Sequence, residues 1–63
     1  MKIKIGNLVQ LKSGGPDMTV DDIGKDRLIK CIWFENNKKC IDYFKSESLI
    51  IINEKDGSIE FAD

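Results

Sequence analysis

The chain has 63 residues, of which 41% are hydrophobic and 33% are charged, and its 10 basic and 11 acidic side chains leave a net charge of -1. This length allows one small domain, residues 1–63, and leaves no room for a second. No block of like charges indicates a nucleic-acid-binding tail or a disordered arm. No apolar run approaches the roughly 20 residues that span a bilayer, so we expect no membrane segment.

Two residue types limit the chemistry that the chain can perform. Histidine is absent, which removes the commonest general base and the commonest metal ligand. Cys31 and Cys40 are too few for a disulfide framework, and they suit small buried side chains better than a metal site that lacks two further ligands. We therefore expect no catalytic residue, no metal and no cofactor. Residues 1–5 alternate in polarity and lack the apolar segment of a signal peptide, so we expect a cytoplasmic protein.

The first third of the chain predicts short strands separated by turns. Residues 3–5 alternate isoleucine with lysine, which indicates a short strand or an arm laid on one. Residues 8–12 and 18–20 each alternate like half-buried strands, and the Ser-Gly-Gly-Pro-Asp sequence of residues 13–17 predicts a wide loop between them. Residues 21–26 are polar and contain a glycine, so they predict the next turn. The side chains expected to point inward are Val9, Leu11, Met18 and Val20.

The centre of the chain predicts a hairpin. Residues 28–34 form an apolar run that contains the only tryptophan, and a second such run occupies residues 40–44. Asn36-Asn37 lies between the two runs, and asparagine tolerates positive φ, so the pair predicts a tight two-residue turn. This turn sets the register, in which the facing pairs are Glu35 with Lys38, Trp33 with Cys40, Cys31 with Asp42, and Ile29 with Phe44.

Because side chains alternate along a strand, this register divides the hairpin into two faces. The face expected to join the core carries Ile29, Cys31, Trp33, Cys40 and Phe44. The other face is more apolar than a solvated surface requires and carries Lys30, Ile32, Phe34, Lys39, Ile41 and Tyr43.

The last third of the chain predicts a short turn and two more strands. Residues 45–48 are polar and compact, which favours a single helical or 3₁₀ turn, and residues 49–53 predict the last core strand. Asp56-Gly57 is a dipeptide favoured in type I′ turns, and it predicts a second hairpin in which Ile52 lies opposite Phe61.

Together these elements predict an all-β fold. We expect a small SH3-like antiparallel barrel of about five strands, with a single 3₁₀ or helical turn before the last core strand. The second hairpin would add an extra C-terminal strand. Closing the sheet hides edges that a small open sheet would expose.

Residues 11–20, Leu-Lys-Ser-Gly-Gly-Pro-Asp-Met-Thr-Val, resemble the opening of the YodC-like family of small bacterial proteins, also found in mobile elements. The similarity continues through residues 31–34, Cys-Ile-Trp-Phe, and on to Phe44 and Leu49, so that it covers roughly Ile5 to Ile51. The resemblance implies a compact SH3-like β fold and no established activity. The chain departs from the family at its C-terminus, where members often end in a polar tail.

Five apolar side chains are candidates for binding a partner: Ile32, Phe34, Ile41, Tyr43 and Phe61. They belong to an excess of apolar residues beyond one small core, and exposed apolar patches tend to mark interfaces. The sequence therefore predicts a non-enzymatic interaction module that binds a protein partner or self-associates.

Two other functions stay open. Lys30 and Lys39 flank the aromatic side chains, as in small barrels that bind nucleic acid, although the net charge of -1 argues against phosphate contacts. The backbone of Ser13, Gly14 and Gly15 could hold an anion, which would suit an oligomer from a mobile element that binds a small anionic ligand or nucleotide. The structural alternative for this loop is that the glycines supply unusual φ angles.

Overall fold

The computed structural model describes residues 2–52 and 59–61, which contain one antiparallel sheet. The strands are β1 (Leu8–Leu11), β2 (Met18–Ile23), β3 (Leu28–Glu35), β4 (Lys38–Lys45), β5 (Leu49–Ile52) and β6 (Ile59–Phe61). One 3₁₀ turn, η1 (Ser46–Ser48), connects β4 to β5. The predicted all-β fold, with a 3₁₀ turn before the last core strand, is confirmed.

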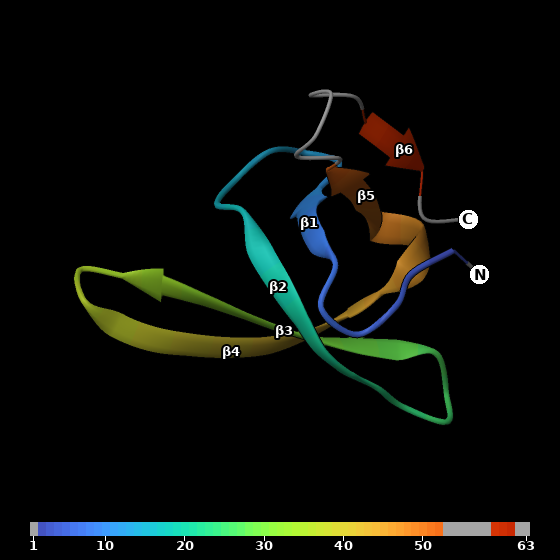
Figure 1. Ribbon diagram of the computed structural model, residues 1–63, viewed down its shortest axis with the longest axis horizontal. Helices are drawn as coiled ribbons and strands as arrows, with labels where there is room; N and C mark the ends of the chain where they lie inside the picture. Colours follow the sequence, from blue (N-terminus) through green and yellow to red (C-terminus); the bar gives the residue numbers. More distant parts are fainter. Residues whose placement is uncertain (1, 53–58, 62–63) are drawn as a thin grey trace.

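The order of the strands in the sheet is β4-β3-β2-β1-β5-β6. The first strand pairs with β2 on one side and with β5 on the other, so strands from the two ends of the chain lie side by side. Figure 1 shows the resulting bend, in which β3 and β4 run across the direction of β1 and β5. The SH3-like name and the closure of the sheet into a barrel stay predictions.

One side of the bent sheet forms the core, because strand side chains alternate between faces. We call its buried side chains the core cluster, which comprises Ile3, Val9, Met18, Val20, Ile29, Cys31, Leu49 and Ile51. Partly buried side chains pack against this cluster, namely Leu11, Ile23, Trp33 and Phe44. The inward positions predicted for the first two strands are confirmed, with Leu11 only partly buried.

The N-terminal segment is an arm laid on the sheet. Residues 2–4 are not part of a strand, yet Ile3 is buried in the core cluster. The Gly6 N–H donates to the carbonyl of Val20 over 2.8 Å, which fixes the arm against β2. Ile5 is exposed, so only one of the two isoleucines contributes to the core.

The predicted turn over residues 21–26 is wrong in its first half, because β2 continues to Ile23. The register of β2 against β3 shifts between Val20 and Asp22, which marks a β-bulge at Asp21. The bulge lets β2 carry two acidic residues and still place Ile23 opposite Ile29, where it packs against the core. The reversal itself falls at residues 24–27.

The predicted pairing of Ile52 with Phe61 is also wrong. Ile52 pairs with Ile59, and Phe61 pairs with Ile50. The connection therefore leaves six residues between the paired ends, whereas a two-residue loop at residues 56–57 would bring Phe61 opposite Ile52. That predicted turn lies outside the described residues. The shift is of two positions, so it leaves each side chain on the same face of the strand.

Candidate functional site

The turn between β3 and β4 determines which side chains share a face. Asn36 and Asn37 have φ angles of 51° and 63°, the left-handed conformation that a type I′ turn requires. Pairing runs without interruption from Glu35 opposite Lys38 down the whole hairpin. The predicted register of this hairpin is confirmed.

The outer face of the hairpin brings together most of the side chains predicted to bind a partner. Phe34 is 72% exposed, Tyr43 56% and Ile41 47%, whereas Ile32 is half-buried. Ile32 and Ile41 are direct cross-strand partners, and Phe34 and Tyr43 occupy the diagonal positions next to them. We call Ile32, Phe34, Ile41 and Tyr43 the outer patch. It is a continuous apolar surface contributed by two strands.

Phe61, the fifth predicted contact, belongs to another part of the sheet. It lies in β6 opposite Ile50, and β6 is the end of the strand order farthest from β4. Its side chain is outside what the structure describes. The predicted site is therefore divided between the outer patch and a separate edge strand.

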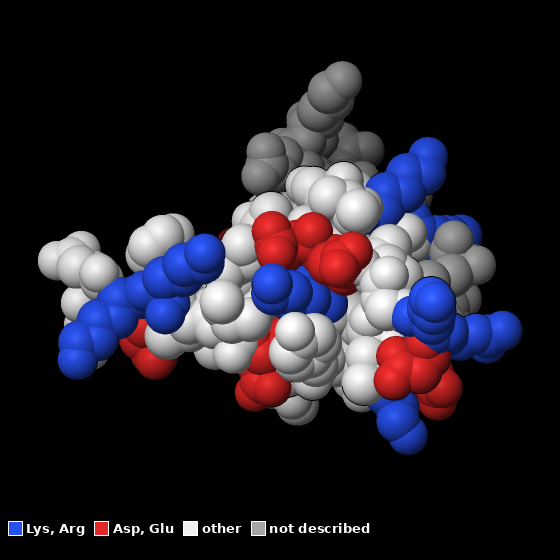
Figure 2. All heavy atoms as spheres, turned by 90° about the horizontal axis from the view of Figure 1, so that it is seen from below, with Lys and Arg blue, Asp and Glu red and all other residues white. Residues whose placement is uncertain are grey.

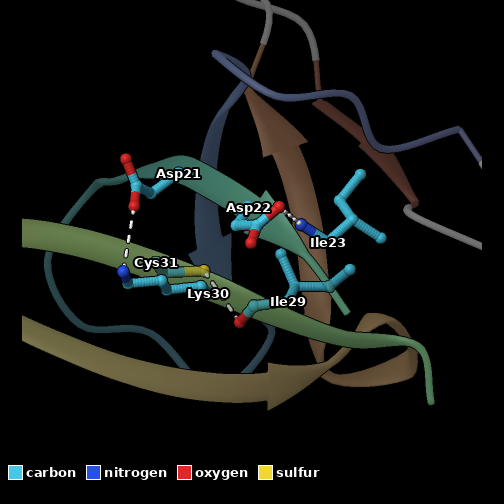
Figure 3. Close-up of polar contacts among 6 residues, drawn as sticks. All are labelled: Asp21, Asp22, Ile23, Ile29, Lys30 and Cys31. Atoms are coloured by element: carbon cyan, nitrogen blue, oxygen red, sulfur yellow. Dashed lines mark hydrogen bonds and ion pairs between the residues drawn. The ribbon is translucent and has the colours of Figure 1, made fainter. Parts of the chain in front are cut away.

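An ion pair borders the outer patch. Lys30 Nζ lies 3.2 Å from Asp21 Oδ2, across the bulge of β2 (Figure 3). The hydrogen bond from Lys30 to Asp21, together with the negative charge of that carboxylate, raises the pKa of Lys30. Asp22 Oδ1 accepts the Ile23 N–H over 2.9 Å. Of the two lysines predicted to flank the aromatic side chains, Lys30 is already paired with an acidic group.

Charges of both signs surround the outer patch. The exposed Lys38 and Lys39 follow the turn at the far end of the hairpin, whereas Asp21 and Asp22 lie on the neighbouring β2. The side of the molecule in Figure 2 has basic groups along the hairpin end with an acidic group beneath them, and acidic and basic groups side by side nearer the centre and at the opposite end. This distribution suits a polar rim around an apolar contact better than a phosphate-binding surface.

The inner face of the same hairpin contributes to the core. Trp33 is half-buried and packs against the core cluster, and its ring centroid lies 6.4 Å from that of Phe44 with an angle of 46° between the planes. The predicted inward orientation of Trp33 is confirmed. Cys40, opposite Trp33, is half-buried and is a free thiol.

Cys31 is also a free thiol and is fully buried. Burial raises the pKa of this thiol to about 11, and the negative charge of Asp42, its cross-strand partner, adds to the effect. Its Sγ lies 3.7 Å from the carbonyl oxygen of Ile29, a weak hydrogen bond drawn in Figure 3. These surroundings favour the neutral thiol, which is the less reactive form of cysteine.

The loop of Ser13, Gly14 and Gly15 uses its glycines to shape the chain. Gly14 and Gly15 have φ angles of 104° and 112°, a backbone conformation that residues with a side chain rarely adopt. The Gly14 N–H donates to the carbonyl of Leu11 over 2.9 Å, and Gln10 Nε2 donates to the Gly15 carbonyl over 2.7 Å. The Gly14 N–H is therefore engaged within the loop and is not directed toward an anion. Binding of an anion by this loop stays a prediction.

A hollow that the sequence did not indicate lies where the β2–β3 turn meets η1. It has a volume of about 220 Å³ and is lined by Asp26, Arg27, Lys45, Ser46 and Glu47. Arg27 has a φ of 67°, an uncommon conformation for a residue with a side chain. No sequence signal marks this position, because arginine is not among the residues enriched at positive φ. The two basic and two acidic side chains give the hollow no net preference for an anion.

Within residues 2–52 and 59–61, no group of three or more His, Cys, Asp or Glu side chains comes together as a metal site. No helix in the same part of the chain is long and apolar enough to cross a membrane.

Comparison with known protein families gives a match. The family model described as "Uncharacterized small protein (DUF2158)" matches residues 4–49, which include β1 to β4, η1 and the first residue of β5. No curated protein and no solved structure matches the chain. Because the match covers most of the 63 residues, the chain belongs to this family of uncharacterised small proteins.

Proposed function

We propose that the protein is a non-enzymatic interaction module and that the outer patch is its protein-binding surface. The observation that carries the proposal is the exposure of Phe34, Ile41 and Tyr43 together on one face of a hairpin. Contiguous exposed apolar surface with a polar rim is typical of protein contact sites.

The position of Phe34, the member of the outer patch nearest the turn, supports this function. β2 pairs with β3 only as far as Ile32, so within residues 2–52 and 59–61 the end of the hairpin beyond that residue has no third strand beside it. Figure 1 shows this end extending away from the other strands, where a partner can reach both faces. Phe34 and Tyr43 supply large, stiff side chains, which often provide most of the binding energy at an interface.

Four finer expectations accompany the proposal: an SH3-like fold, the YodC-like name, a non-enzymatic role and a cytoplasmic location. The pairing of β1 with β5 and the 3₁₀ turn before β5 support an SH3-like fold, and the family match over residues 4–49 is compatible with the YodC-like name. The absence of histidine supports a non-enzymatic role. A cytoplasmic location stays a prediction.

The other two functions receive less support. Nucleic-acid binding needs an excess of cations near the aromatic side chains, whereas Lys30, one of the two lysines that flank them, is paired with Asp21. Binding of a small anion or nucleotide by an oligomer would need loop amides, and the Gly14 N–H is engaged. Retention on nucleic acid that falls steeply with salt, or a thermal shift with nucleotides, would favour one of these functions instead.

Photo-crosslinking tests the proposal. A photo-reactive phenylalanine analogue in place of Phe34 should form a protein adduct of defined mass in cells, either with a partner or with a second copy. The additional substitution Tyr43→Ser should reduce the adduct, and the same analogue at Lys25, in the exposed β2–β3 turn, should give none. The absence of any adduct at position 34, in cells and with the purified protein at micromolar concentration, would reject the proposal.

A further inference from the structure

The strand β4 is an end of the sheet, so one of its two sides is not paired within the described part of the chain. In a hairpin with a two-residue turn, the residues that flank the turn form a hydrogen-bonded pair, here Glu35 with Lys38. Hydrogen-bonded pairs alternate with non-hydrogen-bonded ones. The N–H and C=O groups of Lys39, Ile41 and Tyr43 therefore point away from β3. Such an edge is a template for another strand.

One of these six outward backbone groups is already engaged. The Tyr43 N–H donates to Asp42 Oδ1 over 2.8 Å. The part of the edge suited to a new strand is thus the half nearer the turn, with Lys39 and Ile41. Asp42 keeps a second carboxylate oxygen for another contact.

We propose that two copies of the chain pair antiparallel through β4, with Cys40 of both copies at the two-fold axis. Lys39 and Ile41 of one copy form hydrogen-bonded pairs with Ile41 and Lys39 of the second copy. Lys38 of each copy then faces Asp42 of the other, which gives two opposite-charge pairs. The proposal rests on the interaction-module function, and it deepens that function by naming a second copy as one partner.

The other antiparallel registers are disfavoured by charge or by the engaged amide. An axis at Ile41 needs the Tyr43 N–H, which Asp42 holds. An axis at Asp42 places the Asp42 carboxylates of the two copies opposite each other. An axis at Lys39 places the two Lys39 ammonium groups opposite each other. Like charges directly opposite each other destabilise a strand pair. The Cys40-centred register is the one in which opposite charges face each other.

The pairing also enlarges the outer patch. An isologous two-fold axis perpendicular to the sheet keeps the outer faces of both copies on the same side. Ile41 of each copy lies across from Lys39 of the other, whose aliphatic stem can cover it. Two outer patches are then joined into a single two-fold surface.

Oxidative trapping tests this register. A non-hydrogen-bonded antiparallel pair has Cα atoms about 4.5 Å apart, within the range of a disulfide. Added copper(II) phenanthroline takes two electrons from the pair of Cys40 thiols, their two protons pass to the solvent, and a disulfide-linked dimer should form. Cys40→Ser should abolish the linked dimer, while the fully buried Cys31 remains in place.

Charge exchange provides the decisive variants. Lys38→Asp or Asp42→Lys should weaken dimerisation, measured by sedimentation, by about tenfold or more, because two attractive pairs become repulsive. The double variant Lys38→Asp/Asp42→Lys should restore both dimerisation and the Cys40 link. Lys25→Ser, in the exposed β2–β3 turn, should leave the dimer unchanged.

A purified protein that stays monomeric and forms no Cys40 link would overturn the inference. Dimerisation that is unchanged in both Lys38→Asp and Asp42→Lys would also overturn it, as would a disulfide-linked dimer that persists in Cys40→Ser. Failure of this experiment leaves the proposed function standing if position 34 still crosslinks to another protein. Loss of crosslinking at position 34 with an intact Cys40 dimer would reject the outer patch as the binding surface instead.

Discussion

The β3–β4 hairpin has a near half, around Ile29 and Cys31, and a far half, around Phe34 and the turn. The two halves differ in burial although they belong to one continuous pair of strands. In the near half, Ile29 and Cys31 are fully buried members of the core cluster. In the far half, Phe34 is 72% exposed and only β4 pairs with it. Burial of apolar surface stabilises the folded state. The side chains of the near half therefore stabilise the fold, whereas those of the far half are available for contact.

The largest difference between the two halves should appear on truncation of one side chain in each. Ile29→Ala removes a fully buried side chain and leaves a cavity, so it should cost about 2–5 kcal/mol of unfolding free energy. Phe34→Ala, on the same strand, should change stability by no more than about 0.5 kcal/mol. Urea denaturation followed by circular dichroism measures both.

Equal losses in these two variants would contradict the division of the hairpin. A large loss for Phe34→Ala alone would mean that the far half is covered in the folded protein, and the outer patch would not be a free surface.

Alkaline pH should reduce the stability of the protein through Cys31 and not through Cys40. Folding holds the Cys31 proton up to a pKa of about 11, compared with an ordinary value of 9.0, so the unfolded chain loses the proton first. The resulting stabilisation is fully present below pH 9 and is lost as the pH rises toward 11. The loss should be on the order of 2 kcal/mol.

Denaturation midpoints across this pH range test the expectation. Lysine and tyrosine side chains also titrate there, so the comparison is between variants. Cys31→Ala should show a smaller alkaline loss than the wild type, whereas Cys40→Ala should keep the full loss because Cys31 is unchanged. If the loss of stability at alkaline pH is the same in all three proteins, ionisation of Cys31 is not its cause.

The smallest expected effects concern the turns at the two ends of β3. Arg27 and Asn37 have φ angles of 67° and 63°, and substitution by glycine should relieve the backbone strain at both positions. Arg27→Gly should raise stability by about 1 kcal/mol, and Asn37→Gly by roughly 0.5 kcal/mol, because asparagine tolerates this conformation better. Thermal denaturation can rank the two, and a larger gain at position 37 would contradict this account of strain.

The hairpin was the most predictable part of the fold, because Asn36-Asn37 specifies both the turn and its length. Once the turn is fixed, every pair down to Leu28 opposite Lys45 follows by counting. The outer patch was predictable for the same reason, since its four members occupy alternate positions of two registered strands. The 3₁₀ turn over Ser46–Ser48 followed from a short polar segment between two apolar runs.

The errors arose where tertiary contacts overrode local polarity. Asp21 and Asp22 look like turn residues, but Ile23 gains burial by continuing β2 past a bulge. Asp56-Gly57 suggested a two-residue loop, whereas the pairing of Ile52 with Ile59 requires a longer connection. Arg27 and its hollow could not be predicted, because its positive φ results from the closure of the turn, in which the Gly24 N–H reaches the Leu28 carbonyl over 2.8 Å.

Burial of the N-terminal arm has a consequence for how the domain is delimited. The family match spans residues 4–49, yet Ile3 and Ile51 are 4% and 5% exposed members of the core cluster just beyond its two limits. A minimal version trimmed to the matched segment would open the hydrophobic interior from both sides at once. The cooperative folding unit is therefore wider than the span by which its relatives are recognised.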